Sequence, residues 1–146
     1  MHKYIFDTPR LRARRIGPAD VDAMHAVYGD ADAMRWVGDG VAITLEQCRH
    51  WVEITQRNYT ARGYGMFAVE LKASGAVTGF CGLVHPGGQT EAEIKYAYLR
   101  ETWGQGLATE GAGALIDRAF AEWAMPRVFG TTYEFNVASR RVMEKL

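Results

Sequence analysis

The segment from Val77 to Val84 constrains the fold more than any other part of the chain. Apart from Thr78, its residues are apolar or glycine. Successive side chains of a β-strand point to opposite faces, so an apolar run without alternation predicts a strand that is covered on both faces. Gly79 and Gly82 predict that a neighbouring group approaches this strand closely. We therefore expect it at the centre of a sheet.

One further strand is predicted before the central strand in the sequence, and one after it. They run from Met66 to Leu71 and from Ala92 to Leu99. The connections contain Ala73-Ser74-Gly75 and Pro86-Gly87-Gly88, which are short and rich in turn-forming residues. The three segments are expected to form an antiparallel meander.

The front of the chain predicts one strand followed by helices. Arg10 to Ile16 alternates imperfectly and is interpreted as the first strand, with one solvated face. Asp20 to Tyr28 has the apolar spacing of a short helix. Thr44 and Gln47 resemble a capping box, which predicts a second helix that continues to Tyr59.

The back of the chain contains the clearest amphipathic helix, from Leu107 to Trp123. Its apolar stripe includes Phe120, and Glu110 is expected to point away from the core. A fifth strand from Val128 to Phe135 and a last helix from Val137 to Leu146 follow. The order predicts an α/β (α+β) fold with a mixed, mostly antiparallel sheet and helices on both faces.

Composition limits the classes of function. The chain has 146 residues, 48% of them apolar, so residues 1–146 are expected to form a single domain with one core. Lys plus Arg and Asp plus Glu each total 17, which argues against nucleic-acid or membrane partners. Without a signal sequence or an 18-residue apolar stretch, the protein is expected to be cytoplasmic. The scattered histidines do not predict a metal site.

Arg10, Arg12 and Arg14 lie on one face of the first strand. We interpret them as a solvated sheet edge.

A glycine-rich turn joins the fourth predicted strand to the long helix, at Trp103-Gly104-Gln105-Gly106-Leu107-Ala108-Thr109. A helix N-terminus carries unpaired N–H groups and a partial positive charge, so the turn is a candidate anion site. The alternative is that both glycines only make a tight turn. A dinucleotide-binding fingerprint would need a third glycine near position 109, where this chain has Thr109. A P-loop would need Gly-Lys-Ser or Gly-Lys-Thr, and neither occurs in the sequence.

With this order of elements, the chain closely resembles the GNAT family of N-acetyltransferases, specifically its ribosomal-protein N-terminal acetyltransferase branch (RimJ/RimL). The resemblance covers nearly the whole chain. It is strongest from Trp103 to Glu110 and from Asn136 to Leu146, and it includes Thr8 to Arg12. The family signature consists of Gln or Arg, two variable residues, Gly, one variable residue, and then Gly or Ala. Gly106 and Ala108 match its last two fixed positions. Trp103 takes the Gln/Arg place.

The resemblance implies that acetyl-CoA is the co-substrate and that no metal is needed. The diphosphate would bind the N–H groups of the turn, the pantetheine arm would pair with the fourth strand, and Asn136 would hydrogen-bond the same arm. The cofactor-binding residues implied in this way are Tyr96, Ala97, Tyr98, Trp103, Gly104, Gln105, Gly106, Leu107, Ala108, Thr109 and Asn136.

The resemblance implies direct attack of an amine on the thioester, for which Glu93 and Ser139 are the candidate catalytic residues. Glu93, or Glu91 on the same face, would be a base that acts through water. The alternative is a solvated strand face formed with Lys95. Ser139 would protonate the departing thiolate, because the usual tyrosine position holds Met143. The alternative for Ser139 is a backbone contact at the helix start.

Several other side chains are candidates for the site. Tyr96, Tyr98 and Tyr133 are hydroxyls that could face the cleft. Cys81 could suggest a covalent acyl-enzyme, but a cysteine in an apolar strand is more often a packing residue. Trp36 and Trp51 could line the acceptor side or pack in the core.

The acceptor expected first is a protein N-terminal amine, followed by a small-molecule amine. A degenerate CoA-binding module without turnover and a purely structural subunit are the rivals. Family members continue beyond the position of Leu146, so we expect a truncated or partly ordered chain. A homodimer in which a neighbouring subunit donates a strand would cover the exposed edge.

Overall fold

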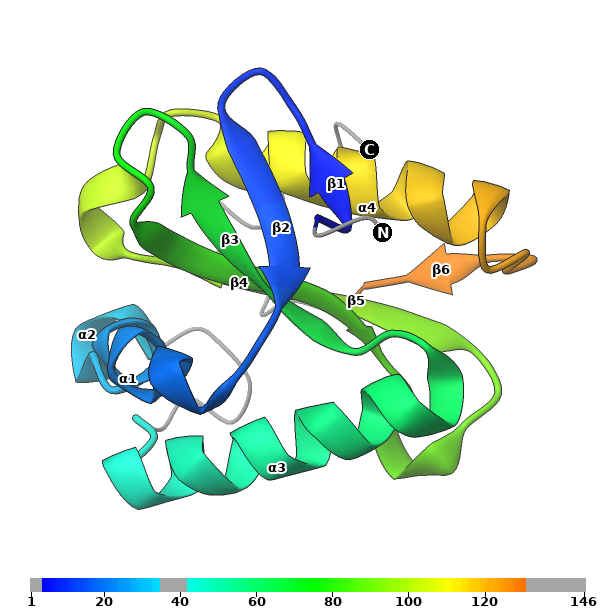
Figure 1. Ribbon diagram of the computed structural model, residues 1–146, viewed down its shortest axis with the longest axis horizontal. Coiled ribbons are helices and arrows are strands. Elements are labelled where there is room, and N and C mark those ends of the chain that lie inside the picture. Colours follow the sequence, from blue (N-terminus) through cyan, green and yellow to red (C-terminus); the bar gives the residue numbers. More distant parts are fainter. Residues whose placement is uncertain (1–3, 35–41, 131–146) are drawn as a thin grey trace.

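A curled sheet of six strands forms the centre of the protein, as seen in the computed structural model, which describes residues 4–34 and 42–130 (Figure 1). Each strand pairs with the next one in the chain, and only the last pair is parallel, which confirms the mixed, mostly antiparallel sheet. The strands are β1 (Phe6–Asp7), β2 (Leu11–Arg15), β3 (Met66–Leu71), β4 (Val77–Val84), β5 (Ala92–Tyr98) and β6 (Val128–Phe129).

Strand β4 is covered on both faces, as its sequence predicts. Phe80 and Leu83 are buried in two different cores, one on each face of the sheet. A Cβ atom on Gly79 would lie 2.4 Å from Cδ1 of Tyr98, and one on Gly82 would lie 2.4 Å from the Gly65 carbonyl oxygen. The absence of a side chain at both glycines therefore allows β3 and β5 to pack closely against β4.

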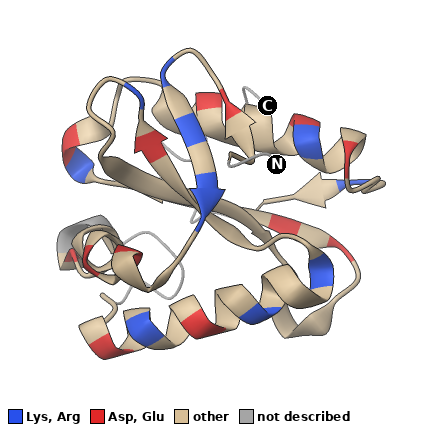
Figure 2. Cartoon of the chain, viewed as in Figure 1, with Lys and Arg blue, Asp and Glu red and all other residues tan. Residues whose placement is uncertain are grey.

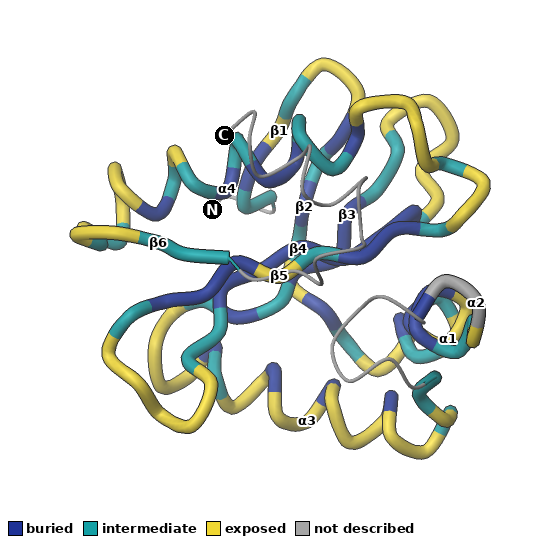
Figure 3. Tube along the Cα trace, turned by 180° about the vertical axis from the view of Figure 1, so that it is seen from behind, coloured by how far each residue is buried: buried dark blue, intermediate teal, exposed yellow. Residues whose placement is uncertain are grey.

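Helices cover both faces of the sheet. The helix α4 lies on one face, and α1 and α3 lie on the other (Figure 1). Figure 3 shows the strands buried between these layers and the outer side of α3 exposed. The helices are α1 (Val21–Tyr28), α2 (Ala31–Met34), α3 (Leu45–Arg62) and α4 (Leu107–Ala121), with the 3-10 turns η1 (Pro18–Asp20), η2 (Pro86–Gly88) and η3 (Arg100–Thr102).

The helix α3 begins at the predicted capping box. Thr44 Oγ1 accepts a hydrogen bond from the Gln47 N–H at 3.1 Å, and Gln47 Oε1 accepts one from the Thr44 N–H at 2.9 Å. Near the end of the helix, the Tyr59 hydroxyl accepts a hydrogen bond from the Ile16 N–H at 2.9 Å and donates to the Met66 carbonyl. Tyr59 thus fixes α3 to the sheet.

Three predictions for the first strand and the long helix were wrong in detail. The strand β2 begins one residue later than expected, and a short strand β1 before it had not been predicted. Phe120, placed on the apolar stripe of α4, is exposed, and Trp123 lies beyond the end of the helix and packs against Tyr64. The helix α4 therefore buries a shorter apolar stripe than the periodicity suggested.

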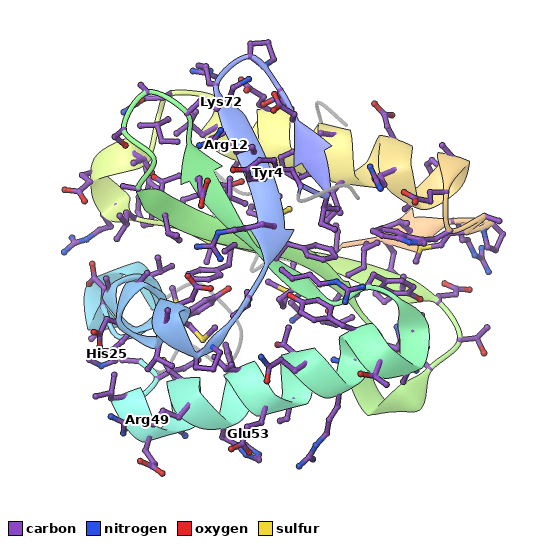
Figure 4. All side chains as sticks on the ribbon, viewed as in Figure 1. Tyr4, Arg12, His25, Arg49, Glu53 and Lys72 are labelled. Carbon is purple, nitrogen blue, oxygen red and sulfur yellow. The ribbon has the colours of Figure 1, made fainter. Side chains whose placement is uncertain are left out.

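The arginines of β2 do not form a solvated edge. Arg12 Nε and Arg14 Nε contact the two carboxylate oxygens of Glu70 on β3, at 3.0 and 2.7 Å, and Arg14 also binds Asp20. Figure 4 shows Arg12 beside Tyr4, whose ring centroid lies 4.8 Å from the guanidinium carbon. These charges are compensated within the sheet, as the adjacent basic and acidic segments in Figure 2 indicate.

No helix within the described ranges is long and apolar enough to cross a membrane. The predicted strand from Val128 to Phe135 is confirmed only as β6. The rest of it and the predicted helix from Val137 to Leu146 lie outside the described residues.

Asp20 connects η1 to β2 and is 5% exposed. Its carboxylate accepts hydrogen bonds from Arg14 and from the Gly17 N–H. Burial alone would raise the pKa of Asp20, but the hydrogen bonds from Arg14 and Gly17 and the charge of Arg14 outweigh it and lower this pKa. The resulting stabilisation is present above the ordinary carboxyl pKa and is lost as pH falls through the lower folded value.

We predict that Asp20→Asn lowers the free energy of unfolding by about 2 kcal/mol at pH 7, because it leaves Arg14 without its full charge partner. Below about pH 4 the variant should lose stability less steeply than the wild type. Urea unfolding at several pH values measures both effects, with the exposed Asp22→Asn as the control. Equal pH profiles for Asp20→Asn and the wild type would contradict the assignment.

Candidate functional site

The glycine turn lies between η3 and α4 with its N–H groups unpaired. Gly104 and Gly106 both have φ of 79°, and Gly106 is the N-cap of α4. The first intrahelical bond runs from the Glu110 N–H to the Gly106 carbonyl at 3.1 Å. Among the described residues, the N–H groups of residues 104–109 have no acceptor. The turn therefore presents main-chain donors at a positive helix end, as predicted.

Space in front of the turn is open. A Cβ atom built on Gly104 would meet no heavy atom within 4 Å, and Trp103 beside it is 50% exposed. Among the described residues, no group therefore blocks the space next to Gly104.

Arg10 connects the glycine turn to Glu110 of α4. Arg10 Nη1 donates to the Gln105 carbonyl at 2.8 Å, and Arg10 Nε lies 2.7 Å from Glu110 Oε1. The Thr8 hydroxyl donates to Glu110 Oε2 at 2.5 Å. Glu110 was expected to point away from the molecule, which was wrong, because it connects α4 to the β1–β2 turn. No local pattern could reveal a contact between residues 100 positions apart.

Burial alone would raise the pKa of Glu110. The hydrogen bonds from Thr8 and Arg10, together with the charge of Arg10, outweigh burial and lower this pKa. Glu110 is therefore ionised at neutral pH.

We call the side of β5 that faces β6 its open side, because no described strand pairs with it beyond Glu93. Within the described part of the chain, β6 pairs with β5 only at Ala92 and Glu93. Polar groups of a strand alternate between its two sides. The Leu99 N–H donates to the Thr78 carbonyl at the end of β4, so the backbone groups of Tyr96 and Tyr98 point to the open side.

Trp103 closes the far end of this open side. Its indole N–H donates to the Tyr98 carbonyl at 2.9 Å. The N–H and carbonyl of Ala97 face β4, so of the three residues predicted to pair with an extended ligand, only Tyr96 and Tyr98 present backbone groups to it. The pairing itself stays a prediction.

Glu93 is not part of a solvated strand face, because it is only 5% exposed. Its carboxylate lies 3.1 Å from the Lys95 Nζ. Ile94 and Tyr98 belong to the core beneath α4, so Glu93 lies on the opposite face of β5, the one covered by α1 and α3. Glu91 is ion-paired with Arg127 at 2.5 Å. Both candidate bases are thus paired with cationic side chains. The spacing of Glu93 and Lys95, two residues apart on one strand face, was the sequence signal that could have predicted their ion pair.

Tyr98 does not present its hydroxyl to the open side of β5. The hydroxyl is buried and has no hydrogen-bond partner among the described residues, and a Cβ atom on Gly111 of α4 would lie 2.5 Å from it. Burial raises the pKa of Tyr98 well above its ordinary value. The Tyr98 side chain is therefore a packing element.

Cys81 lies in β4 with no exposed surface, and burial raises its pKa to about 12. A thiol in this state is neutral and inaccessible, which agrees with a packing role.

Trp51, on α3, is partly exposed and makes an edge contact with Tyr28 at a centroid distance of 5.3 Å.

The predicted residues Asn136, Ser139 and Met143 lie outside the described residues, as do Tyr133 and Trp36. Among the residues that are described, no group of three His, Cys, Asp or Glu side chains lies together in a way that could hold a metal ion.

Comparison with known proteins identifies the family. The sequence model of the acetyltransferase (GNAT) domain matches residues 10–146. The chain belongs to the GNAT acetyltransferase family. It is 33% identical to the uncharacterized protein YkkB of Bacillus subtilis over 142 residues, which cover 95% of the chain and 81% of the relative. The uncharacterized N-acetyltransferase YoaA of the same organism is 24% identical, with coverages of 97% and 81%.

Solved structures of GNAT proteins share the fold. A GNAT acetyltransferase from Bacillus anthracis has a TM-score of 0.80 and 29% identity, covering 95% of this chain and 80% of that one. The ribosomal-protein α-N-acetyltransferase RimL, in complex with coenzyme A, has a TM-score of 0.81 and 20% identity, with coverages of 97% and 81%. The GNAT family uses acetyl-CoA as its acyl donor.

We predict that Cys81→Ala retains acetyl transfer, because the reaction of this GNAT enzyme does not pass through the buried thiol. The native protein should also resist thiol-labelling reagents until it is unfolded, since Cys48 is buried as well. Labelling followed by mass spectrometry measures this, with the urea-unfolded protein as the positive control. Loss of transfer in a folded Cys81→Ala variant would contradict direct attack.

Proposed function

We propose that this enzyme transfers the acetyl group of acetyl-CoA to the α-amine of a protein N-terminus. The observation that carries the proposal is the row of unpaired N–H groups at residues 104–109, beside the open side of β5. The N–H groups would bind the diphosphate, and Tyr96 and Tyr98 would pair with the pantetheine arm. This arrangement would place the thioester next to the point where β6 leaves β5.

At that point the neutral amine attacks the thioester carbonyl and the C–S bond breaks, so that the attacking nitrogen loses one proton and the departing thiolate gains one. Backbone N–H groups on the open side of β5 are suitable donors to the developing oxyanion. Glu93 lies in the adjacent part of β5 and would accept a proton through water. Asn136 would bind the arm and Ser139 would supply the proton to the thiolate.

The acceptor proposal rests on the weak proton chemistry available at the site. An α-amine has a reference pKa near ~8 against ~10.4 for lysine, so it needs far less help to become neutral. Glu91 and Glu93 are both engaged in ion pairs. A site without an uncommitted base among its described carboxylates favours the acceptor that loses its proton most easily.

A small-molecule amine is the second candidate. A 41-residue stretch of the chain is 49% identical to an FsC-acetyl coenzyme A-N(2)-transacetylase of Aspergillus fumigatus, although this stretch covers only 28% of the chain and 17% of the relative. Because the match covers only 17% of the relative, it gives weak support to a shared acceptor.

We predict that Gly104→Ala weakens coenzyme A binding about tenfold, because φ of 79° disfavours a side chain and the new methyl group projects into the anion site. The matched control is Gly75→Ala in the β3–β4 turn, where φ is 74° and the surrounding space is equally open. Both variants should lose about 1 kcal/mol of stability, but only Gly104→Ala should lose affinity in calorimetry. Equal affinities would disprove binding at the turn.

We predict that a peptide with a free N-terminus releases thiol from acetyl-CoA faster than an N-terminally blocked peptide with one lysine, or than a polyamine. Glu93→Gln should lower kcat about tenfold or more without raising the KM for acetyl-CoA, and Glu91→Gln should have a smaller effect. Release with small amines alone would reject the N-terminal acceptor. Binding of coenzyme A without release for any amine would favour a module without turnover.

A further inference from the structure

Arg10 is the residue outside the glycine turn that most directly fixes its conformation. It lies in the β1–β2 turn, yet its Nη1 donates to the Gln105 carbonyl at 2.8 Å. The same side chain contacts Glu110 through Nε at 2.7 Å, and the Arg10 main-chain N–H donates to Glu110 Oε2 at 3.0 Å. One arginine therefore connects the turn with the first residues of α4.

The bond to Gln105 determines where the next N–H group points. In a trans peptide the carbonyl and the N–H of the same unit point in opposite directions. Since the Gln105 carbonyl is directed at Arg10, the Gly106 N–H is directed away from Arg10. Gly106, on one side of this peptide, has no side chain, so its φ meets little steric resistance when the peptide rotates. A rotated peptide would present a carbonyl oxygen where the anion needs a donor.

Glu110 adds an electrostatic reason for the contact. Glu110 belongs to the first turn of α4, the helix end that the glycine turn enters. An uncompensated negative charge at this place would repel an incoming phosphate. Arg10 neutralises this charge while leaving the N–H groups of the turn unpaired.

We propose that Arg10 is a positioning residue for the donor substrate: it orients the Gln105–Gly106 peptide and screens Glu110 so that the turn accepts the diphosphate of coenzyme A. This inference rests on the proposed function, because it assumes that the diphosphate binds there. It assigns the β1–β2 turn to the donor site.

The test compares Arg10→Ala with Lys72→Ala. Lys72 Nζ contacts Asp7 at 2.5 Å and the Thr8 carbonyl at 3.1 Å, so its removal deletes a cation and two contacts from the same β1–β2 turn without touching the glycine turn. Calorimetry with coenzyme A should show about tenfold weaker binding for Arg10→Ala and wild-type affinity for Lys72→Ala.

Acetyl-pantetheine separates positioning from general damage, because it lacks the diphosphate. Arg10→Ala should raise the KM for acetyl-CoA about tenfold with little change in kcat, and kcat/KM for acetyl-pantetheine should stay at the wild-type value. Equal losses with both donors would overturn the proposal, since a merely structural role damages both.

The milder variant Arg10→Lys keeps the proposal testable if Arg10→Ala does not fold. Arg10→Lys retains the charge but cannot contact Gln105 and Glu110 with the same fork, so about threefold weaker binding is expected. Adding Glu110→Gln to Arg10→Ala should recover part of the lost affinity. If the wild type binds coenzyme A and both Arg10 variants bind it equally well, the role of Arg10 is rejected and the proposed function stands. If the wild type does not bind it, both fall.

Discussion

The position of α4 against β5 depends on the packing of Tyr98. Its ring lies over Gly79 of β4, and its hydroxyl lies against Gly111 of α4, where a Cβ atom would come within 2.5 Å. Two missing side chains thus let the helix approach the end of β5. The Trp103 indole then binds the Tyr98 carbonyl, so the turn that enters α4 starts beside the open side of the same strand. The cost is a buried hydroxyl without a partner.

Charge around the site is locally balanced. Glu93 pairs with Lys95, Glu91 with Arg127, and Glu110 with Arg10. Because these ionised side chains are compensated, the unpaired N–H groups of the turn and the α4 helix end remain as local positive potential for an anion. This agrees with a chain whose formal net charge is zero. Recognition of the donor would then depend on main-chain geometry more than on an overall electrostatic field.

The sequence predicted the features that depend on local chemistry. The strand from Met66 to Leu71, the capping box at Thr44 and the glycine turn before Leu107 were all confirmed. The two residues of β1 are too few to carry a periodic signal. The ion pair between Arg10 and Glu110 depends on the complete fold, because the β1–β2 turn reaches α4 only after the sheet has formed. The burial of Glu93 was also missed, since alternation alone does not reveal how closely α1 and α3 cover that face.

A donor site made of backbone groups, as proposed above, would explain why the fold persists while the sequence changes. The unpaired N–H groups of the turn require small residues at few positions, and the open side of β5 requires only that β6 diverges. Side chains elsewhere are then constrained by packing, which tolerates substitution if volume and pattern are kept. RimL accordingly retains a TM-score of 0.81 at 20% identity.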